Sequence, residues 1–118
     1  MRMLGSNVES VNWPACGEID IAAQGGSELN KIYGTLHYPG LPESGDGITK
    51  MIPDATNAFH KYTLEWSVES IMTSVDDIPF FVTANSKHLP FNHDFFLIFN
   101  IALGGDFEYK AGCCKRYR

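Results

Sequence analysis

The stretch GEIDIA, Gly17–Ala22, alternates polar and apolar side chains. A period of two is typical of a β-strand with one buried face and one open face. Glu18 and Asp20 would then lie on the open face, with Ile19 and Ile21 on the buried face. We therefore predict a strand that presents two carboxylates side by side, with Cα atoms roughly 6.5 to 7 Å apart.

Strand-like patterning recurs along the rest of the chain. We predict further strands over Lys31–Tyr38, Phe59–Ser67, Ser70–Val75, Pro79–Ala84 and Asp94–Leu103. Turn-forming residues separate them, and the longest predicted loop covers residues 39–57. The last segment is apolar on both faces, which predicts a strand in the middle of a layered core. About six short strands, without a helix of normal length, indicate an all-β sandwich or barrel.

Composition excludes several classes of partner. The chain has 118 residues, the size of one domain, and its formal net charge of -5 argues against nucleic acid. No apolar run approaches the roughly 18 residues of a membrane span, so no membrane partner is expected. The N-terminus lacks the apolar segment of a signal peptide. Residues 110–118, KAGCCKRYR, carry four basic and no acidic side chains, which predicts a separate basic tail.

The three cysteines do not form a disulfide framework, because their number is odd and two are adjacent. We expect Cys16 to be a free, buried thiol. Pairing of Cys16 with Cys113 or Cys114 is the alternative. No spacing of cysteine and histidine suggests a zinc site.

Glu18 and Asp20 suit glycoside hydrolysis, in which one carboxylate attacks the sugar and another protonates the leaving oxygen. Their mutual repulsion would raise at least one pKa unless a third group compensates. The alternative is a strand whose polar face is only solvated. The spacing alone favours that alternative, because two acids two residues apart occur often by chance.

Five sequence blocks, taken in order, change this balance. They are MLGSN at residues 3–7, WPACGEIDI at 13–21, YGTLHY at 33–38, FHKYTLEW at 59–66 and FFLIFNIALGG at 95–105. Together they resemble glycoside hydrolase family 16, especially its laminarinase-like endo-β-1,3-glucanases. The resemblance implies a β-jelly-roll sandwich of the concanavalin A-like type, with sugar bound along the concave face.

The resemblance also implies a domain that is incomplete at both termini, since the family's first and last strands have no counterpart here. We expect residues 1–109 to form a partial family-16-like domain and 110–118 to be the basic tail. Family members are usually secreted, which implies an extracellular location even though this chain shows no signal peptide. No cofactor and no metal are expected, because the family's calcium ligands lie largely in the segments without a counterpart.

By matching positions, the resemblance makes Glu18 the nucleophile and Asp20 the residue that tunes it. The family's acid/base glutamate belongs at position 23 in a bulged strand, or at position 22 in a regular one. Both positions hold alanine, Ala22 and Ala23. An amide such as Gln24 has no proton at a useful pKa to give, and Glu28 is the alternative donor if its loop folds back.

Three further residues are candidates for contact with sugar. Trp13 is expected to stack on a pyranose ring, because such rings present apolar C–H faces. His37 is expected to donate hydrogen bonds to sugar hydroxyls, and Asn100 to face the floor of the cleft. The alternatives are a half-buried core role for Trp13, a structural role for His37, and internal hydrogen bonding for Asn100.

The first functional hypothesis is retaining hydrolysis of internal β-1,3 or mixed β-1,3/1,4 glucosidic bonds, impaired because alanine replaces the acid/base. The partner would be a β-glucan polysaccharide or oligosaccharide. The second is a non-catalytic β-glucan-binding module. The third is a truncated, degenerate β-glucanase whose unpaired sheet edges promote aggregation.

Overall fold

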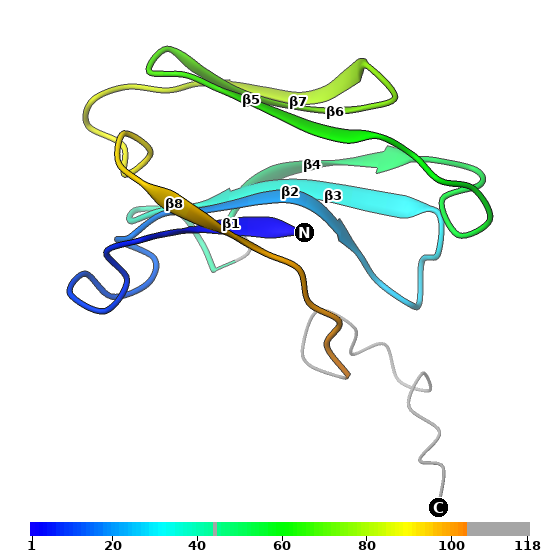
Figure 1. Cartoon of the computed structure of the whole chain (residues 1–118), viewed down its shortest axis with the longest axis horizontal. Helices are drawn as coiled ribbons and strands as arrows, with labels where there is room; N and C mark the ends of the chain where they lie inside the picture. Colours follow the sequence, from blue (N-terminus) through cyan, green and yellow to red (C-terminus); the bar gives the residue numbers. More distant parts are fainter. Residues whose placement is uncertain (44, 104–118) are drawn as a thin grey trace, which may run out of the picture.

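The computed structural model describes residues 1–43 and 45–103, which form two stacked antiparallel β-sheets (Figure 1). In this part of the chain the larger sheet has five strands in the order β4-β3-β2-β1-β8. They are β1 Arg2–Gly5, β2 Glu18–Gln24, β3 Lys31–His37, β4 Asp46–Met51 and β8 Phe95–Ile98. The smaller sheet consists of β5 Tyr62–Trp66, β6 Ser70–Val75 and β7 Ile78–Ala84, in that order. The predicted all-β sandwich is confirmed.

The main core lies between the two sheets. Ile19 and Ile21 of β2 and Leu36 of β3 pack against Ile71 of β6 and Phe81 of β7. Full burial of such a side chain contributes about 1.5 to 3 kcal/mol. The alternation in GEIDIA therefore points its isoleucines inward, as predicted, and leaves the opposite face of β2 for Glu18 and Asp20.

A second core cluster consists of Ile32, Ile52 and Val75. Between the two clusters the layers approach closely at Gly34 of β3. A Cβ atom there would lie 2.9 Å from the Phe80 ring of β7. The sequence therefore needs a residue without a side chain at the centre of β3.

Two strands were not predicted. The loop prediction over residues 39–57 is wrong in part, because β4 occupies Asp46–Met51. Most side chains of β4 are exposed, so the strand leaves no apolar periodicity in the sequence. The four residues of β1 are too few for a period of two to be recognised.

The prediction that Asp94–Leu103 forms a central strand is also wrong. Among the described residues, β8 covers only Phe95–Ile98 and lies at the edge of the larger sheet, beside β1 (Figure 1). Phe96 is 43% exposed and Leu97 is 49% exposed. The strand is apolar on both faces, as the sequence indicated, but no described strand pairs with its outer edge.

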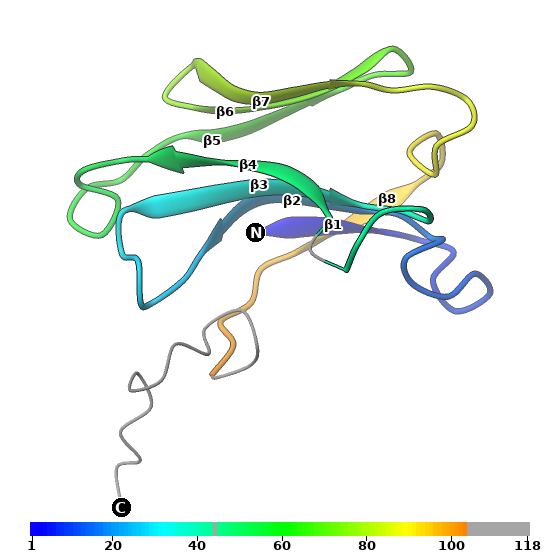
Figure 2. The same ribbon diagram turned by 180° about the vertical axis from the view of Figure 1, so that it is seen from behind.

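Figure 2, seen from behind, shows β4 at the opposite edge of the larger sheet. No helix in the described ranges is long and apolar enough to cross a membrane. Cys16 is fully buried and free, as expected from its packing. The basic tail, with Cys113 and Cys114, lies outside the described residues.

Candidate active site

The face of the larger sheet that points away from the smaller sheet carries both carboxylates of β2. Cross-strand partners share a face in an antiparallel sheet. Arg2 of β1 is paired with Asp20, and His37 of β3 is paired with Glu18. Three adjacent strands therefore project charged or polar side chains onto one open face.

A β-bulge in β2 determines which residue follows Asp20 on this face. The register with β3 shifts between Asp20 and Ala23, so that one extra residue is accommodated in β2. The amides of Ile21 and Ala22 both donate to the carbonyl of Met1, at 3.1 and 3.2 Å. Ala22 packs against the second core cluster, and Ala23 comes to the same face as Asp20.

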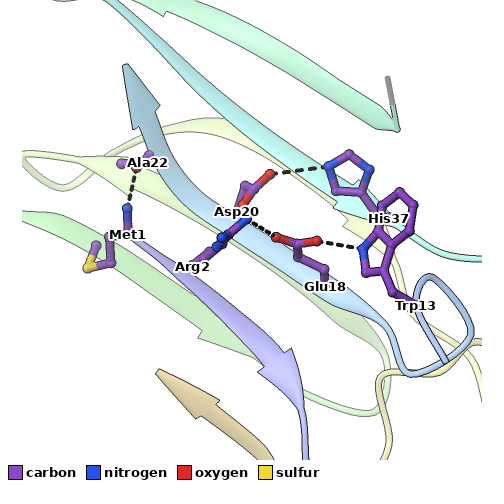
Figure 3. Close-up of polar contacts among 7 residues, drawn as sticks. All are labelled: Met1, Arg2, Trp13, Glu18, Asp20, Ala22 and His37. Carbon is purple, nitrogen blue, oxygen red and sulfur yellow. Dashed lines mark hydrogen bonds and ion pairs between the residues drawn. The ribbon is translucent and has the colours of Figure 1, made fainter. Parts of the chain in front are cut away.

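Both oxygens of the Glu18 carboxylate accept hydrogen bonds, as Figure 3 shows. Arg2 Nη1 donates to Oε1 at 2.8 Å, and Trp13 Nε1 donates to Oε2 at 2.6 Å. Glu18 is only 6% exposed, and a buried carboxylate is stable only with such donors. The two contacts fix the orientation of the carboxylate.

Asp20 is linked to Trp13, the donor to Glu18, through the neighbouring imidazole of His37. His37 Nε2 donates to Asp20 Oδ2 at 3.2 Å, and the ring centroids of His37 and Trp13 lie 5.6 Å apart (Figure 3). The hydrogen bond to Asp20 raises the pKa of His37, against the opposing effect of burial, and the charges of Asp20 and Glu18 add to the rise. Glu18, Asp20, Trp13 and His37 thus form one connected group.

A hollow of about 590 Å³ opens beside this group, and we call it the Ala23 hollow. Its lining includes Arg2, Asp20, Ala23 and Asn100. The volume falls within the roughly 300 to 1,000 Å³ that is usual for ligand pockets. Asn100 therefore lies beside the same open space as Asp20.

A smaller hollow of about 290 Å³ adjoins Trp13 and His37. Tyr38 and Pro42 also line it. The Trp13 side chain is not buried, since the residue is 44% exposed, so part of its ring is accessible to a ligand. The open face thus offers space on both sides of the Glu18 carboxylate.

The two residues considered as replacements for the acid/base have other partners, although Gln24 lines the Ala23 hollow. Gln24 Nε2 donates to the carbonyl of Leu29. The Glu28 carboxylate accepts from the Tyr33 hydroxyl at 2.8 Å and lies 3.3 Å from Lys31 Nζ. Glu28 is not among the residues that line the Ala23 hollow.

Arg2 is the site residue that the sequence analysis missed. Its strand, β1, was not predicted, so nothing placed it beside Glu18. The only signal in the sequence was the positive charge of Arg2 close to a strand with two acidic residues. Charge alone does not define a residue's position in the fold. No group of three His, Cys, Asp or Glu side chains in the described part of the chain is arranged to hold a metal ion.

Comparison with known proteins matches residues 3–112 to the family described as glycosyl hydrolases family 16. The chain is 33% identical over 119 residues to a glucan endo-1,3-beta-glucosidase of Cryptopygus antarcticus, covering 89% of this chain and 44% of that protein. It is 36% identical over 115 residues to a beta-glucanase of Rhodothermus marinus, covering 87% and 40%. It is 32% identical over 126 residues to a beta-1,3-glucan-binding protein of Penaeus monodon, covering 79% and 34%.

The fold is similar to the laminarinase catalytic domain from Thermotoga maritima MSB8, with a TM-score of 0.82 and 34% identity. That match covers 90% of this chain and 47% of the other. The predicted β-jelly-roll sandwich is thereby confirmed. The chain spans less than half the length of each of these relatives.

Proposed function

The chain belongs to glycosyl hydrolases family 16, and on that premise we propose that its open face binds a β-glucan and hydrolyses it slowly. The bonds cleaved would be internal β-1,3 or mixed β-1,3/1,4 glucosidic bonds. The observation that carries the proposal is the connected group of Glu18, Asp20, Trp13 and His37 beside the Ala23 hollow.

In this proposal Glu18 is the nucleophile of a retaining double displacement. Its carboxylate attacks the anomeric carbon, and water later releases the sugar from the glycosyl-enzyme. Asp20 acts on the same face, and its bond to His37 fixes its orientation. Trp13 and Asn100 would contact the sugar from the two hollows.

The slowness follows from position 23. The bulge brings Ala23, and not Ala22, to the face of Glu18 and Asp20, which supports position 23 as the place of the acid/base. General acid catalysis typically contributes about 10²- to 10⁴-fold. An alanine methyl group provides none of this, so the leaving alkoxide would depart without a proton from the polypeptide.

The experiment that tests the role of position 23 compares the unaltered chain with Ala23→Glu and Ala23→Gln. Glutamine has nearly the same shape as glutamate but no acidic proton. Release of reducing ends from laminarin is measured after circular dichroism shows that each variant is folded. We expect Ala23→Glu to raise the rate by about 10²- to 10⁴-fold and Ala23→Gln to leave it unchanged. Adding Glu18→Gln to the Ala23→Glu variant should abolish the gain.

A second candidate function is binding of β-glucan without turnover. The alanine at position 23 and the similarity to a beta-1,3-glucan-binding protein favour it. Affinity electrophoresis in laminarin separates the two candidates. Retarded migration of a folded Ala23→Glu variant that releases no reducing ends would support binding alone and contradict the hydrolytic proposal.

A further inference from the structure

The Ala23 hollow is open where a proton donor would be needed. Ala23 contributes only a methyl group, and the hollow of about 590 Å³ lies directly beside Asp20. Arg2 and Asn100 line the same space and carry N–H donors suited to a carboxyl oxygen. The Arg2 side chain is 41% exposed, so its contact with Glu18 does not cover it.

The charged groups around the hollow include the N-terminal ammonium of Met1, a lining residue, which donates to the carbonyl of Ala22 at 2.8 Å. Arg2 is bonded to Glu18, and His37 is bonded to Asp20. In these two pairs each cation is matched by a carboxylate, and the carboxylates of Glu18 and Asp20 favour the protonated form of an acid that enters. The Met1 ammonium offers a further N–H donor to a carboxyl oxygen, so the hollow provides partners both for a carboxylic acid and for its conjugate base.

The polypeptide's own candidates are engaged at other contacts. Gln24 is bonded to the Leu29 carbonyl, and Glu28 is held between Tyr33 and Lys31. Glu28 does not line the Ala23 hollow. Neither side chain therefore offers an acidic proton at the Ala23 hollow, which leaves room there for a donor from solution.

We infer that the Ala23 hollow accepts a small monocarboxylic acid, such as formic or acetic acid, which serves as the missing acid/base. This inference rests on the proposed function. In the first step a Glu18 oxygen bonds to the anomeric carbon, the bond to the glycosidic oxygen breaks, and the acid's proton passes to that oxygen. In the second step the resulting carboxylate takes a proton from water, whose oxygen bonds to the anomeric carbon as Glu18 departs. The acid is thereby regenerated.

The kinetic test measures laminarin hydrolysis by the unaltered chain near pH 4.5, in formate or acetate against chloride at equal ionic strength. We expect a saturable increase of at least about 10-fold with either acid, since general acid catalysis supplies 10²-fold or more. Ala23→Leu, which fills the hollow, should remove the response. The matched variant Ala58→Leu, in an exposed turn, should retain it.

The outcomes separate this inference from the function on which it rests. If the Ala23→Glu variant hydrolyses laminarin but neither acid raises the rate of the unaltered chain, the inference of an external donor is wrong. The proposed function is then still supported. If neither the acids nor Ala23→Glu produces hydrolysis by folded protein, both ideas fail.

A binding measurement provides an independent readout. Acetate is titrated into ¹⁵N-labelled protein, and amide shifts are followed against a chloride titration at the same pH. We expect saturable shifts confined to the lining of the hollow, including Ala23 and Gly26, and their loss in Ala23→Leu. Shifts that are unsaturable or spread evenly over the chain would refute the site.

Discussion

At the scale of single residues, the two donors to Glu18 are not equivalent. Trp13 supplies a neutral N–H, whereas Arg2 supplies the positive charge that compensates the carboxylate. Glu18 is almost fully buried, so removal of its cation leaves a charge without compensation. The partial exposure of Arg2 reduces this effect, because solvent screens the pair from one side.

We expect Arg2→Met, which keeps the apolar stem, to lower the free energy of unfolding by about 1 to 3 kcal/mol. Urea denaturation at pH 7 measures the change. In a Glu18→Gln background the same substitution should matter much less, because no charge is then left unpaired. Strictly additive effects of the two changes would show that the ion pair contributes nothing.

His37 gives the site a dependence on pH. Its pKa lies above the ordinary value of 6.5, chiefly because of the hydrogen bond to Asp20. A raised pKa in the folded state means that the protonated form stabilises the fold. This contribution is complete below about pH 6.5 and is lost as the pH rises through the folded-state pKa.

An NMR titration of the His37 imidazole tests this directly. We expect a pKa above 6.5 in the unaltered chain and a lower value in Asp20→Asn, in which the acceptor loses its charge. Identical His37 titrations in the two proteins would contradict the assigned partner.

At the scale of elements, the start of β2 depends on Gly17. This residue has φ of +76°, and a Cβ there would lie 2.5 Å from the carbonyl oxygen of Pro90. Gly17→Ala therefore combines backbone strain with a clash against main chain, and we expect a loss of about 2 kcal/mol or more. Gly40→Ala is the matched control, because φ there is +94° but its Cβ would meet nothing. In thermal unfolding, Gly17→Ala should have a much lower midpoint temperature than Gly40→Ala. Equal decreases in the two variants would exclude the clash.

The turn between β6 and β7 is tied to the segment before β5. Asp76 accepts from His60 Nδ1 at 2.7 Å and from the Lys61 amide at 2.9 Å. The hydrogen bond raises the pKa of His60 and lowers that of Asp76. The stabilising contribution of His60 is thus present below pH 6.5 and lost above its raised pKa, whereas that of Asp76 is lost as the pH falls below 3.8.

We expect Asp76→Asn to return the pKa of His60 toward 6.5, as measured by NMR titration. Asp77→Asn, in the same turn but without a bond to His60, provides the comparison. A pKa of His60 that is unchanged by Asp76→Asn would mean that Asp54, 3.3 Å from its Nε2, is the dominant partner.

Sequence patterning predicted the strands that bury one face completely. β6 was predicted with its exact bounds, and the alternation in GEIDIA placed Ile19 and Ile21 in the core. β4 was not predicted, because an exposed strand needs no apolar periodicity. β8 was predicted in the middle of the core instead of at an edge, because apolar side chains do not show which strands lie beside it. The contact of Arg2 with Glu18 was beyond reach for the same reason, since it depends on pairing between strands distant in sequence.

At the scale of the whole molecule, β8 presents an apolar edge. Phe96 and Leu97 are about half exposed, and no strand of the described chain pairs with the outer side of β8. Unpaired apolar edges are templates for pairing with another chain. We therefore expect this edge to promote self-association.

We expect Leu97→Lys to reduce self-association, because a charge on an edge strand opposes pairing. Sedimentation velocity over a range of protein concentrations measures the effect. Val68→Lys makes the same exchange at an exposed turn position and should change association little. A stronger effect at Val68 would place the contact on the smaller sheet.

The two sheets also differ in the sequence separation between the strands that pair in them. β5, β6 and β7 follow one another directly, whereas β1 pairs with β8 from nearly the opposite end of the described chain. Each doubling of a closed loop adds roughly 0.6 kcal/mol of entropic cost, and distant contacts slow folding. We therefore expect β5, β6 and β7 to pair early in folding and β8 to dock last. During synthesis, most of the described chain would accordingly leave the ribosome before β8 can pair with β1. Arg2, the cation beside Glu18, lies on β1 and gains its second neighbouring strand only then.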